Sequence, residues 1–222
     1  MKSTLRIYLG AALAAAVLSA SLMGSASAAN STPAISAFQA LIANVHSYTF
    51  RLQSHEVKGS QTQSRVYQYW FMKPHFAKTL ILSGDGQGSG GVWSGGNTVS
   101  GHQGGILSMI HLTVSIHDPR ATSLLGYTIP DGLLQNVVDK YVTTPGRLSQ
   151  VAGGKINGQL TDAVTLIPNG PTPKRHITKM MIFFSRTSHL PLRNIEWSGN
   201  TIILDQSFLH IKLHAHLNGG NF

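Results

Sequence analysis

The chain has 222 residues, with 17 Lys and Arg against 8 Asp and Glu, 11 His and no Cys, so its formal net charge is +9. The absence of Cys excludes disulfides, thiolate metal sites, a Cys nucleophile and the lipid-modified Cys of a bacterial lipoprotein. The basic residues are scattered, with Lys174-Arg175-His176 as their one tight group. This distribution, together with the export signal described next, argues against a nucleic-acid partner.

Residues 1–28 have the pattern of a secretory signal peptide. Two basic residues precede an apolar run over residues 7–23, and small residues suited to a signal peptidase follow it. The alternative is an uncleaved membrane anchor, but the run is short for a span and is interrupted by Gly and Ser. We therefore expect cleavage after Ala28 or Ala29, export to the periplasm, and a single mature domain over residues 29–222.

The first part of the mature chain predicts one helix followed by three strands. Thr32 and Pro33 suit the N-cap and the first helical position, and apolar residues then recur at helical spacing as far as residue 46. Beyond that point the period changes to two, which is typical of strands. The expected strands cover residues 48–53, 65–73 and 76–82.

The segment 84–91 is rich in glycine. A phosphate-binding loop would end in Gly-Lys-Ser/Thr and precede a helix, whereas this segment leads into Val92-Trp93, the start of a strand. It therefore predicts a flexible hairpin connection, with residues 97–102 as the partner strand. Residues 106–116 are apolar enough for another strand or a short helix.

The second part of the chain repeats the order of helix and then strands. After a break at Asp118-Pro119, the spacing of apolar residues predicts an amphipathic helix over 131–142. Asn and Gly residues then mark turns between further strands. The expected strands cover residues 148–156, 159–167, 177–185, 192–197 and 201–213. This order predicts one α+β domain built on a large antiparallel sheet.

Several of the predicted strands are apolar on both faces. Tyr69 and Phe71 alternate with Trp70 and Met72, and residues 180–184 are apolar without interruption. A half-buried strand normally has one polar face, so these strands need cover on both sides or line an apolar cavity. The pattern alone leaves open whether the covered space is a ligand-binding hollow or an ordinary filled core.

Two stretches of the chain resemble the LolA/LolB-like superfamily of exported lipoprotein carriers. From Ile35 to Pro74, a helix, a Ser-Tyr-Thr-Phe strand and a strand ending in Lys-Pro are similar to the family's opening segment. From Met180 to Leu213, a strand leads through His189-Leu190-Pro191-Leu192-Arg193 and a Ser-Gly-Asn turn to a last strand. The resemblance implies a curved antiparallel half-barrel, with helices covering its concave side and acyl chains sheltered between sheet and helices.

The resemblance also implies a non-catalytic binding function without a cofactor, with lipids or lipidated proteins as cargo and envelope proteins as further partners. Residues of the two-faced strands and of the second helix are the candidates for the walls of the cavity, although which strand face turns inward is open. The candidate ligand-binding residues are Phe50, Leu52, Tyr69, Phe71, Met181 and Phe183 on strands, with Leu134, Val137, Val138 and Tyr141 as a lid.

Three other functions compete with this interpretation. The same half-barrel with a filled core would be a structural or interaction module of the envelope. His214 and His216, on one face of the last predicted strand, form a possible metal-chelating pair. Ser108, His111 or His117, and Asp118 could be assembled for hydrolysis, but no nucleophile elbow accompanies them and Asp118 before Pro119 suits a turn. We therefore expect no enzyme activity.

Overall fold

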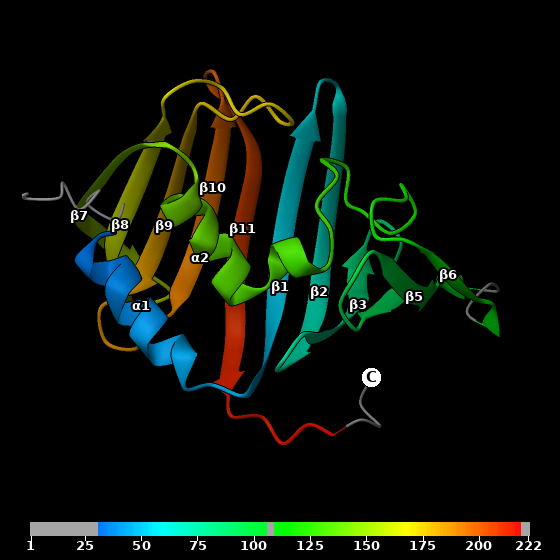
Figure 1. Cartoon of the computed structure of the whole chain (residues 1–222). Coiled ribbons are helices and arrows are strands. Elements are labelled where there is room, and N and C mark those ends of the chain that lie inside the picture. The colour runs from blue at the N-terminus through cyan, green and yellow to red at the C-terminus, as the bar shows by residue number, and fades with distance from the viewer. Residues whose placement is uncertain (1–30, 106–108, 219–222) are drawn as a thin grey trace, which may run out of the picture.

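The computed structural model describes residues 31–105 and 109–218, so the predicted signal peptide and Ser108 lie outside the described residues. The chain forms an eleven-stranded antiparallel sheet in the order β6-β5-β4-β3-β2-β1-β11-β10-β9-β8-β7 (Figure 1). The strands are β1 Ser47–Lys58, β2 Gln61–Met72, β3 Phe76–Gly84, β4 Gly90–Trp93, β5 Thr98–His102, β6 His111–Ser115, β7 Gly146–Ile156, β8 Gln159–Pro168, β9 Lys179–Ser185, β10 Pro191–Ser198 and β11 Thr201–Leu213. The helices are α1 Pro33–Ala43 and α2 Leu134–Thr143, with a short 3-10 helix, η2, at Pro130–Gly132.

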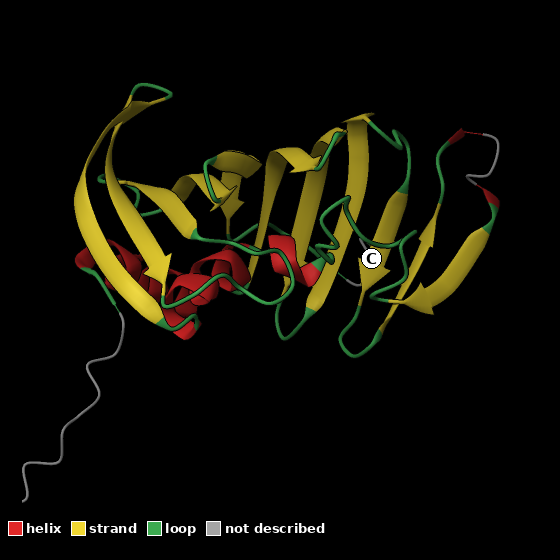
Figure 2. Cartoon of the chain, turned by 90° about the horizontal axis from the view of Figure 1, so that it is seen from above, coloured by secondary structure: helices red, strands yellow, loops and turns green. Residues whose placement is uncertain are grey.

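The sheet is open and strongly curved, and both helices lie on its concave side (Figure 2). They cover β7 to β11 and β1, whereas β3 to β6 extend beyond them as an arm (Figure 1). The predicted α+β half-barrel with helices on the concave side is therefore confirmed. No helix in residues 31–105 and 109–218 is both long and apolar enough to cross a membrane.

Helix α1 begins where the sequence predicts and ends three residues earlier. Thr32 is the N-cap and Pro33 the first helical residue, but the Thr32 hydroxyl makes no capping hydrogen bond. The backbone N–H of Ala34 instead donates to the side-chain oxygen of Gln150 on β7, at 3.0 Å. The cap is thus supplied by the sheet, which joins the start of α1 to the edge strand β7.

Helix α2 starts three residues later than the predicted position 131. The carboxylate of Asp131 accepts hydrogen bonds from the backbone N–H and the hydroxyl of Thr128, at 2.8 and 2.9 Å. These contacts stabilise the 3-10 helix η2, after which Leu133 is extended. The helical spacing of apolar residues begins at Leu133, but the local side-chain contacts of Asp131 keep the first turn separate from the helix.

The strands agree with the predicted ones except at their ends. β1 and β2 pair without interruption from Ser47↔Met72 to Lys58↔Gln61, so both are longer than their apolar alternation indicates. The glycine-rich segment joins β3 to β4 as a hairpin, as predicted. Within residues 106–116, the described part contains the strand β6.

The hydrophobic core lies between the two helices and the sheet. Ile35 and Phe38 of α1 and Val137 and Val138 of α2 are almost completely buried, and Phe38 contacts Phe184 of β9 with ring centroids 5.9 Å apart. Side chains form a buried core in this half of the molecule, with a cavity of about 610 Å³ at its edge beside α1. In the described part of the chain no α-helix lies above the arm, and its concave side is covered instead by the segment that follows β6.

Candidate functional site

A cavity of about 720 Å³ lies between the concave face of β1 to β6 and residues 117–132, which we call the strap. The strap runs from the end of β6 back across β2 and β1 to α2 (Figure 1). Apolar side chains from the sheet, from the strap and from Ile110 line much of it. They are Leu52, Tyr69, Ile81, Val99, Ile110, Leu112, Val114, Ala121 and Ile129.

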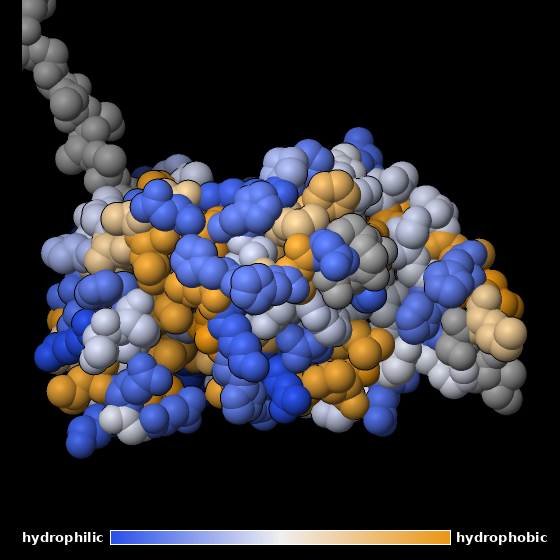
Figure 3. Space-filling view, turned by 90° about the horizontal axis from the view of Figure 1, so that it is seen from below, coloured by the Kyte–Doolittle hydropathy of each residue, from blue (hydrophilic) through white to orange (hydrophobic). Residues whose placement is uncertain are grey.

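The cavity reaches solvent at the β6 edge of the sheet. Ile110 and Leu112 line it and are 52% and 47% exposed, and the neighbouring Met109 is 89% exposed. Apolar surface is visible at this outer end of the arm, beside the grey residues, in Figure 3. Leu52 on β1, by contrast, is 2% exposed. The cavity therefore extends from an open apolar edge to a buried inner end.

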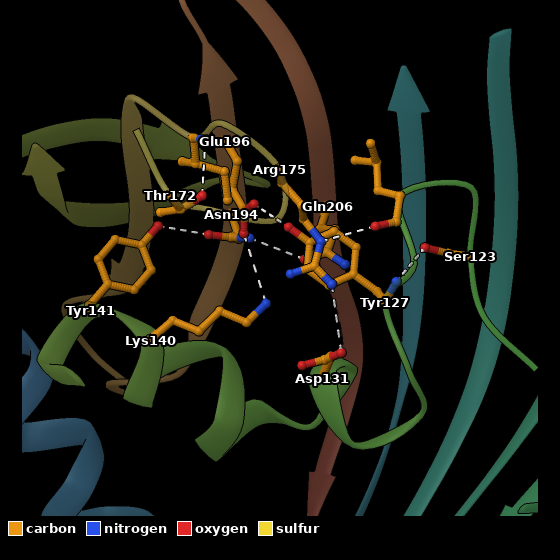
Figure 4. Close-up of polar contacts among 12 residues, drawn as sticks. Ser123, Tyr127, Asp131, Lys140, Tyr141, Thr172, Arg175, Asn194, Glu196 and Gln206 are labelled. Atoms are coloured by element: carbon orange, nitrogen blue, oxygen red, sulfur yellow. Dashed lines mark hydrogen bonds and ion pairs between the residues drawn. The ribbon is translucent and has the colours of Figure 1, made fainter. Parts of the chain in front are cut away.

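Tyr127 anchors the middle of the strap to the sheet (Figure 4). Its hydroxyl donates a short hydrogen bond to the carboxylate of Glu196 on β10, which is completely buried. Its ring lies between the Arg175 guanidinium, 3.6 Å from the ring centroid, and the Lys140 ammonium, 4.3 Å from it. Lys140 Nζ is also 3.9 Å from Glu196 Oε1, so two cations and one anion surround the tyrosine.

Arg175 holds a second part of the strap. Its Nε and Nη2 donate to the backbone carbonyls of Leu125 and Gly126, at 3.0 and 3.1 Å, and Nη2 lies 3.9 Å from Asp131. Arg175 stands in the loop between β8 and β9, which the chain reaches about fifty residues after the strap. The strap is thus held over the cavity by side chains that are remote from it in sequence.

The carboxylate of Glu56 on β1 binds the strap from the sheet side. It is 3% exposed and accepts hydrogen bonds from the backbone N–H of Leu125, at 2.8 Å, and from the side chain of Ser123. Burial raises the pKa of the Glu56 carboxyl, and these two hydrogen bonds and the nearby Arg65 charge offset only part of that rise. Glu56 is the acidic residue among those that line the cavity.

Arg65, Ser54 and Gln206 form a polar row at the inner end of the cavity. Ser54 on β1 pairs with Arg65 on β2 and with Gln206 on β11, so the three side chains share the concave face of adjacent strands. All three line the cavity. The hydroxyl of Ser54 is buried and has no hydrogen-bond partner among the described residues.

The structure brings most of the predicted binding residues together on the concave side, but only part of them at the cavity. Leu52 and Tyr69 line it. The others lie in the hydrophobic core beneath the helices: Phe50, Phe71, Leu134, Val137, Val138 and Tyr141. Tyr141 also donates a hydrogen bond from its hydroxyl to Asn194 Oδ1, at 2.7 Å.

Met181 and Phe183 lie on the other face of the sheet. On β9 the fully buried core residues are Met180, Ile182 and Phe184, and successive side chains of a strand point to opposite faces. The sequence did not distinguish the two faces because both are apolar. These two residues are therefore separated by the sheet from the cavity and from the other candidates.

Sequence reasoning missed the polar residues of the site. The inward positions of β1 are Tyr48, Phe50, Leu52, Ser54 and Glu56, so the concave face changes from apolar to polar partway along the strand. Polar side chains in an alternating strand are read as facing solvent, yet Ser54 and Glu56 are buried. The continuous period of two from Tyr48 to Glu56 is the signal that places them inward.

The residues of the competing functions do not form a site in the part of the chain that is described. β11 ends at Leu213, so His214 and His216 follow the strand rather than sharing one of its faces. No cluster of three or more His, Cys, Asp or Glu that could hold a metal ion occurs in residues 31–105 and 109–218. Asp118 forms an ion pair with Arg120 at 2.8 Å. Hydrogen bonds from the side chain and the backbone N–H of Arg120 lower the pKa of the Asp118 carboxyl to about 2.

Neither a family model nor a curated protein matches this sequence. Similar solved structures include an uncharacterised conserved protein from Thermus thermophilus, with 8% identity, a TM-score of 0.53, and 84% of this chain and 90% of that chain covered. Lipoprotein LppX from Mycobacterium tuberculosis has 15% identity and a TM-score of 0.50, with 85% and 99% covered. A LolA superfamily protein from Nitrosomonas europaea has 8% identity and a TM-score of 0.38, with 81% and 90% covered.

At these identities the likeness to the Thermus thermophilus protein and to LppX shows a shared fold. Together with the curved half-barrel described above, it confirms the fold that the sequence resemblance implied.

Proposed function

We propose that this protein is an exported, non-catalytic carrier or binding protein for lipids, and that the cargo lies in the cavity beneath the strap. The cavity carries this proposal. Its volume of about 720 Å³ is within the ~300–1,000 Å³ of pockets that hold small molecules. Apolar side chains from the sheet and from the strap line it, and polar side chains lie along it from Ser54 and Arg65 at the inner end to His102 and Gln103 on the arm.

The need for such a cavity follows from the energy of an acyl chain in water. Transfer of a methylene group from water to an apolar site is worth about 0.8 kcal/mol, so a sixteen-carbon chain gains on the order of 10 kcal/mol when it is sheltered. Leu52, Tyr69 and Val99 would make contact with the chain, and Ile110 and Leu112 would lie where it enters. The strap would then have to open for loading and release.

The cavity favours a carrier over an interaction module with a filled core. Side chains form a buried core in the half of the sheet under α1 and α2, as that alternative requires, apart from a cavity of about 610 Å³ at its edge. The other half retains open space between β1 to β6 and the strap. A module that serves only as a scaffold has no need for an apolar hollow of this size, because unfilled volume lowers stability.

Lipid extraction and a cavity-blocking variant test the proposal. The mature protein, purified from its exporting host, is extracted with organic solvent for lipid mass spectrometry, and the delipidated protein is titrated with the neutral apolar dye Nile red. We expect co-purifying lipid and saturable dye binding. Val99→Trp fills the cavity and should abolish both, whereas Ile202→Trp, at a 42% exposed position on β11 outside the cavity, should leave them unchanged.

The opposite result has a clear meaning. If the wild-type protein carries no lipid and takes up no dye, or if Val99→Trp and Ile202→Trp bind equally, the carrier proposal is wrong and an interaction module takes its place.

A further inference from the structure

We propose that Arg65, Ser54 and Gln206 bind the carboxylate of a long-chain fatty acid, whose hydrocarbon chain runs across β3, β4 and β5 toward the open β6 edge. This inference rests on the proposed carrier function and specifies its ligand and its orientation. The juxtaposition of three hydrogen-bond donors at the buried inner end of the cavity carries it.

The hydroxyl of Ser54 is the first observation. Ser54 is 5% exposed, lines the cavity, and its Oγ has no hydrogen-bond partner among the described residues. Buried hydroxyl groups are nearly always hydrogen-bonded, because an unsatisfied one loses its hydration without compensation. An acceptor atom on a bound ligand would give the Ser54 hydroxyl the hydrogen-bond partner that it lacks.

The amide of Gln206 is the second observation. The Tyr141 hydroxyl donates to Asn194 Oδ1, so the Asn194 amide nitrogen is available to donate, and it does so to Gln206 Oε1 at 3.1 Å. This chain of hydrogen bonds occupies the oxygen of Gln206 and leaves its amide nitrogen as the group that donates elsewhere. Two buried residues outside the cavity thus orient Gln206 as a donor.

The guanidinium of Arg65 is the third observation. Its Nε donates to the backbone carbonyl of Asp85 at 2.7 Å, and its Nη1 donates to the Tyr67 hydroxyl at 3.2 Å. Both partners are neutral, and within residues 31–105 and 109–218 no carboxylate forms an ion pair with Arg65. A half-buried cation held in place by neutral groups beside a cavity is suited to a ligand anion.

The other charges around the cavity favour a single negative charge. Glu56 is near enough to feel the Arg65 charge and would repel an anion when ionised. Its carboxyl group, however, faces Leu125 and Ser123 of the strap, and burial raises its pKa and so favours its neutral form. Arg120 is neutralised by Asp118. One unpaired guanidinium and two neutral donors match a carboxylate, whereas a phosphate brings more charge and more acceptor oxygens than this row satisfies.

The shape of the cavity sets the direction of the chain. Lining residues run from Gln206 on β11 and Ser54 on β1 to Leu112 and Val114 on β6, which is five strand spacings along the sheet from β1. With strands about 4.8 Å apart, the distance along the sheet from β1 to β6 is roughly 24 Å. Gly91 and Gly101 carry no side chains along this path. An extended chain with its head at the inner end therefore fits better than a compact ligand.

Binding of matched single-chain ligands tests the inference. Delipidated mature protein is titrated with palmitic acid, hexadecanol and hexadecyl phosphate by displacement of Nile red. For the wild type we expect palmitate to bind most tightly. Arg65→Gln should weaken the binding of palmitate by about tenfold or more and leave the binding of hexadecanol nearly unchanged. Arg51→Gln, on the exposed opposite face of β1, is the matched control and should alter neither.

Ser54→Ala separates a ligand role from a structural one. Because the hydroxyl has no protein partner, its removal should not lower the melting temperature of the empty protein and should raise it slightly, while palmitate binding weakens several-fold. A hydroxyl with a purely structural role would lower the melting temperature.

The outcomes distinguish this inference from the carrier proposal. If Nile red and all three ligands fail to bind, both the carrier proposal and the carboxylate site are wrong. If Nile red and hexadecanol bind but palmitate is not preferred, or if Arg65→Gln weakens palmitate and hexadecanol equally, the carboxylate site alone is wrong. Preference for hexadecyl phosphate would also overturn it.

Discussion

At the scale of single residues, the buried carboxyl group of Glu56 makes stability depend on pH. Burial raises the pKa of the Glu56 carboxyl above its ordinary value of 4.5. The folded protein therefore holds this proton at pH values where the unfolded chain has released it. Stability from Glu56 is fully present below the ordinary pKa and declines as pH rises toward the folded-state pKa, above which the loss is constant.

Glu56→Gln should remove this dependence. Glutamine keeps an acceptor for the backbone N–H of Leu125 but carries no charge. The variant should gain stability relative to the wild type as pH rises from about 4 to about 7, measured as the difference in urea midpoints at the two values. A difference that stays constant, or that moves in favour of the wild type at higher pH, would show that burial does not dominate.

A second residue-scale prediction concerns the hydroxyl of Tyr127. Tyr127→Phe keeps the ring between Arg175 and Lys140 but leaves the Glu196 carboxylate without its hydrogen-bond donor. Because Glu196 is completely buried, we expect a loss of about 1–3 kcal/mol in the free energy of unfolding in urea.

Tyr69→Phe makes the same chemical change at a residue that lines the cavity, where no protein hydrogen bond involves the hydroxyl in the described part of the chain. Tyr69→Phe should therefore leave the free energy of unfolding nearly unchanged. Equal losses in the two variants would mean that Tyr127 is not a special anchor.

At the scale of elements, the strap decides how cargo enters. The two carbonyl contacts of Arg175, at Leu125 and Gly126, depend on the forked geometry of a guanidinium. Arg175→Lys keeps the positive charge but cannot make both contacts. We expect faster amide hydrogen exchange in strap peptides and faster exchange of bound dye, with the fold unchanged.

Arg186→Lys is the control for this variant, because it makes the same change in a more exposed pair with Asp162. In Arg186→Lys, amide hydrogen exchange in the strap should stay at the wild-type rate. Strap exchange that is insensitive to Arg175→Lys would indicate that Tyr127 and Glu56 are sufficient to hold it.

The elements also show what could be predicted from the sequence. Periodicity identifies both helices and the long strands, because these elements bury one face and so repeat their apolar residues, whereas it leaves residues 106–116 open between a strand and a short helix. It fails where local contacts override it, as when Asp131 binds Thr128 and delays α2. It also fails to choose a face on β9, where Met181 and Met180 are equally apolar although only one face meets the helices.

The candidate site was predicted only in part, because the pairing of strands rather than the local sequence pattern assembles its polar residues. Leu52 and Tyr69 stand out because they are apolar residues in alternating strands. Arg65 and Ser54 come from the consecutive strands β2 and β1, Gln206 comes from the remote strand β11, and the pairing of β2, β1 and β11 brings the three together. The strap has no periodic pattern, so its role depends on its contacts with Glu56, Tyr127 and Arg175.

At the scale of the whole molecule, the carrier proposal requires export, which depends on the first 28 residues. Lys2 and Arg6 would keep the amino end on the cytoplasmic side, and Ala26 and Ala28 are small enough for the peptidase pocket. Removing this segment takes away two of the 17 basic residues and none of the 8 acidic ones, so the mature chain has 15 against 8, or a net charge of +7.

Mass spectrometry of the exported protein tests this processing. We expect a mature chain that begins at Ala29 or Asn30 and is recovered from the soluble periplasmic fraction. Ala28→Arg should block cleavage, because a long charged side chain does not fit a pocket for small residues, and the uncut protein should stay with the membrane. Asn30→Ala, just past the expected cut, should be processed normally. Intact Met1 on the wild-type protein in a membrane fraction would mean that residues 7–23 act as an anchor, and a cargo carrier that diffuses freely would then be excluded.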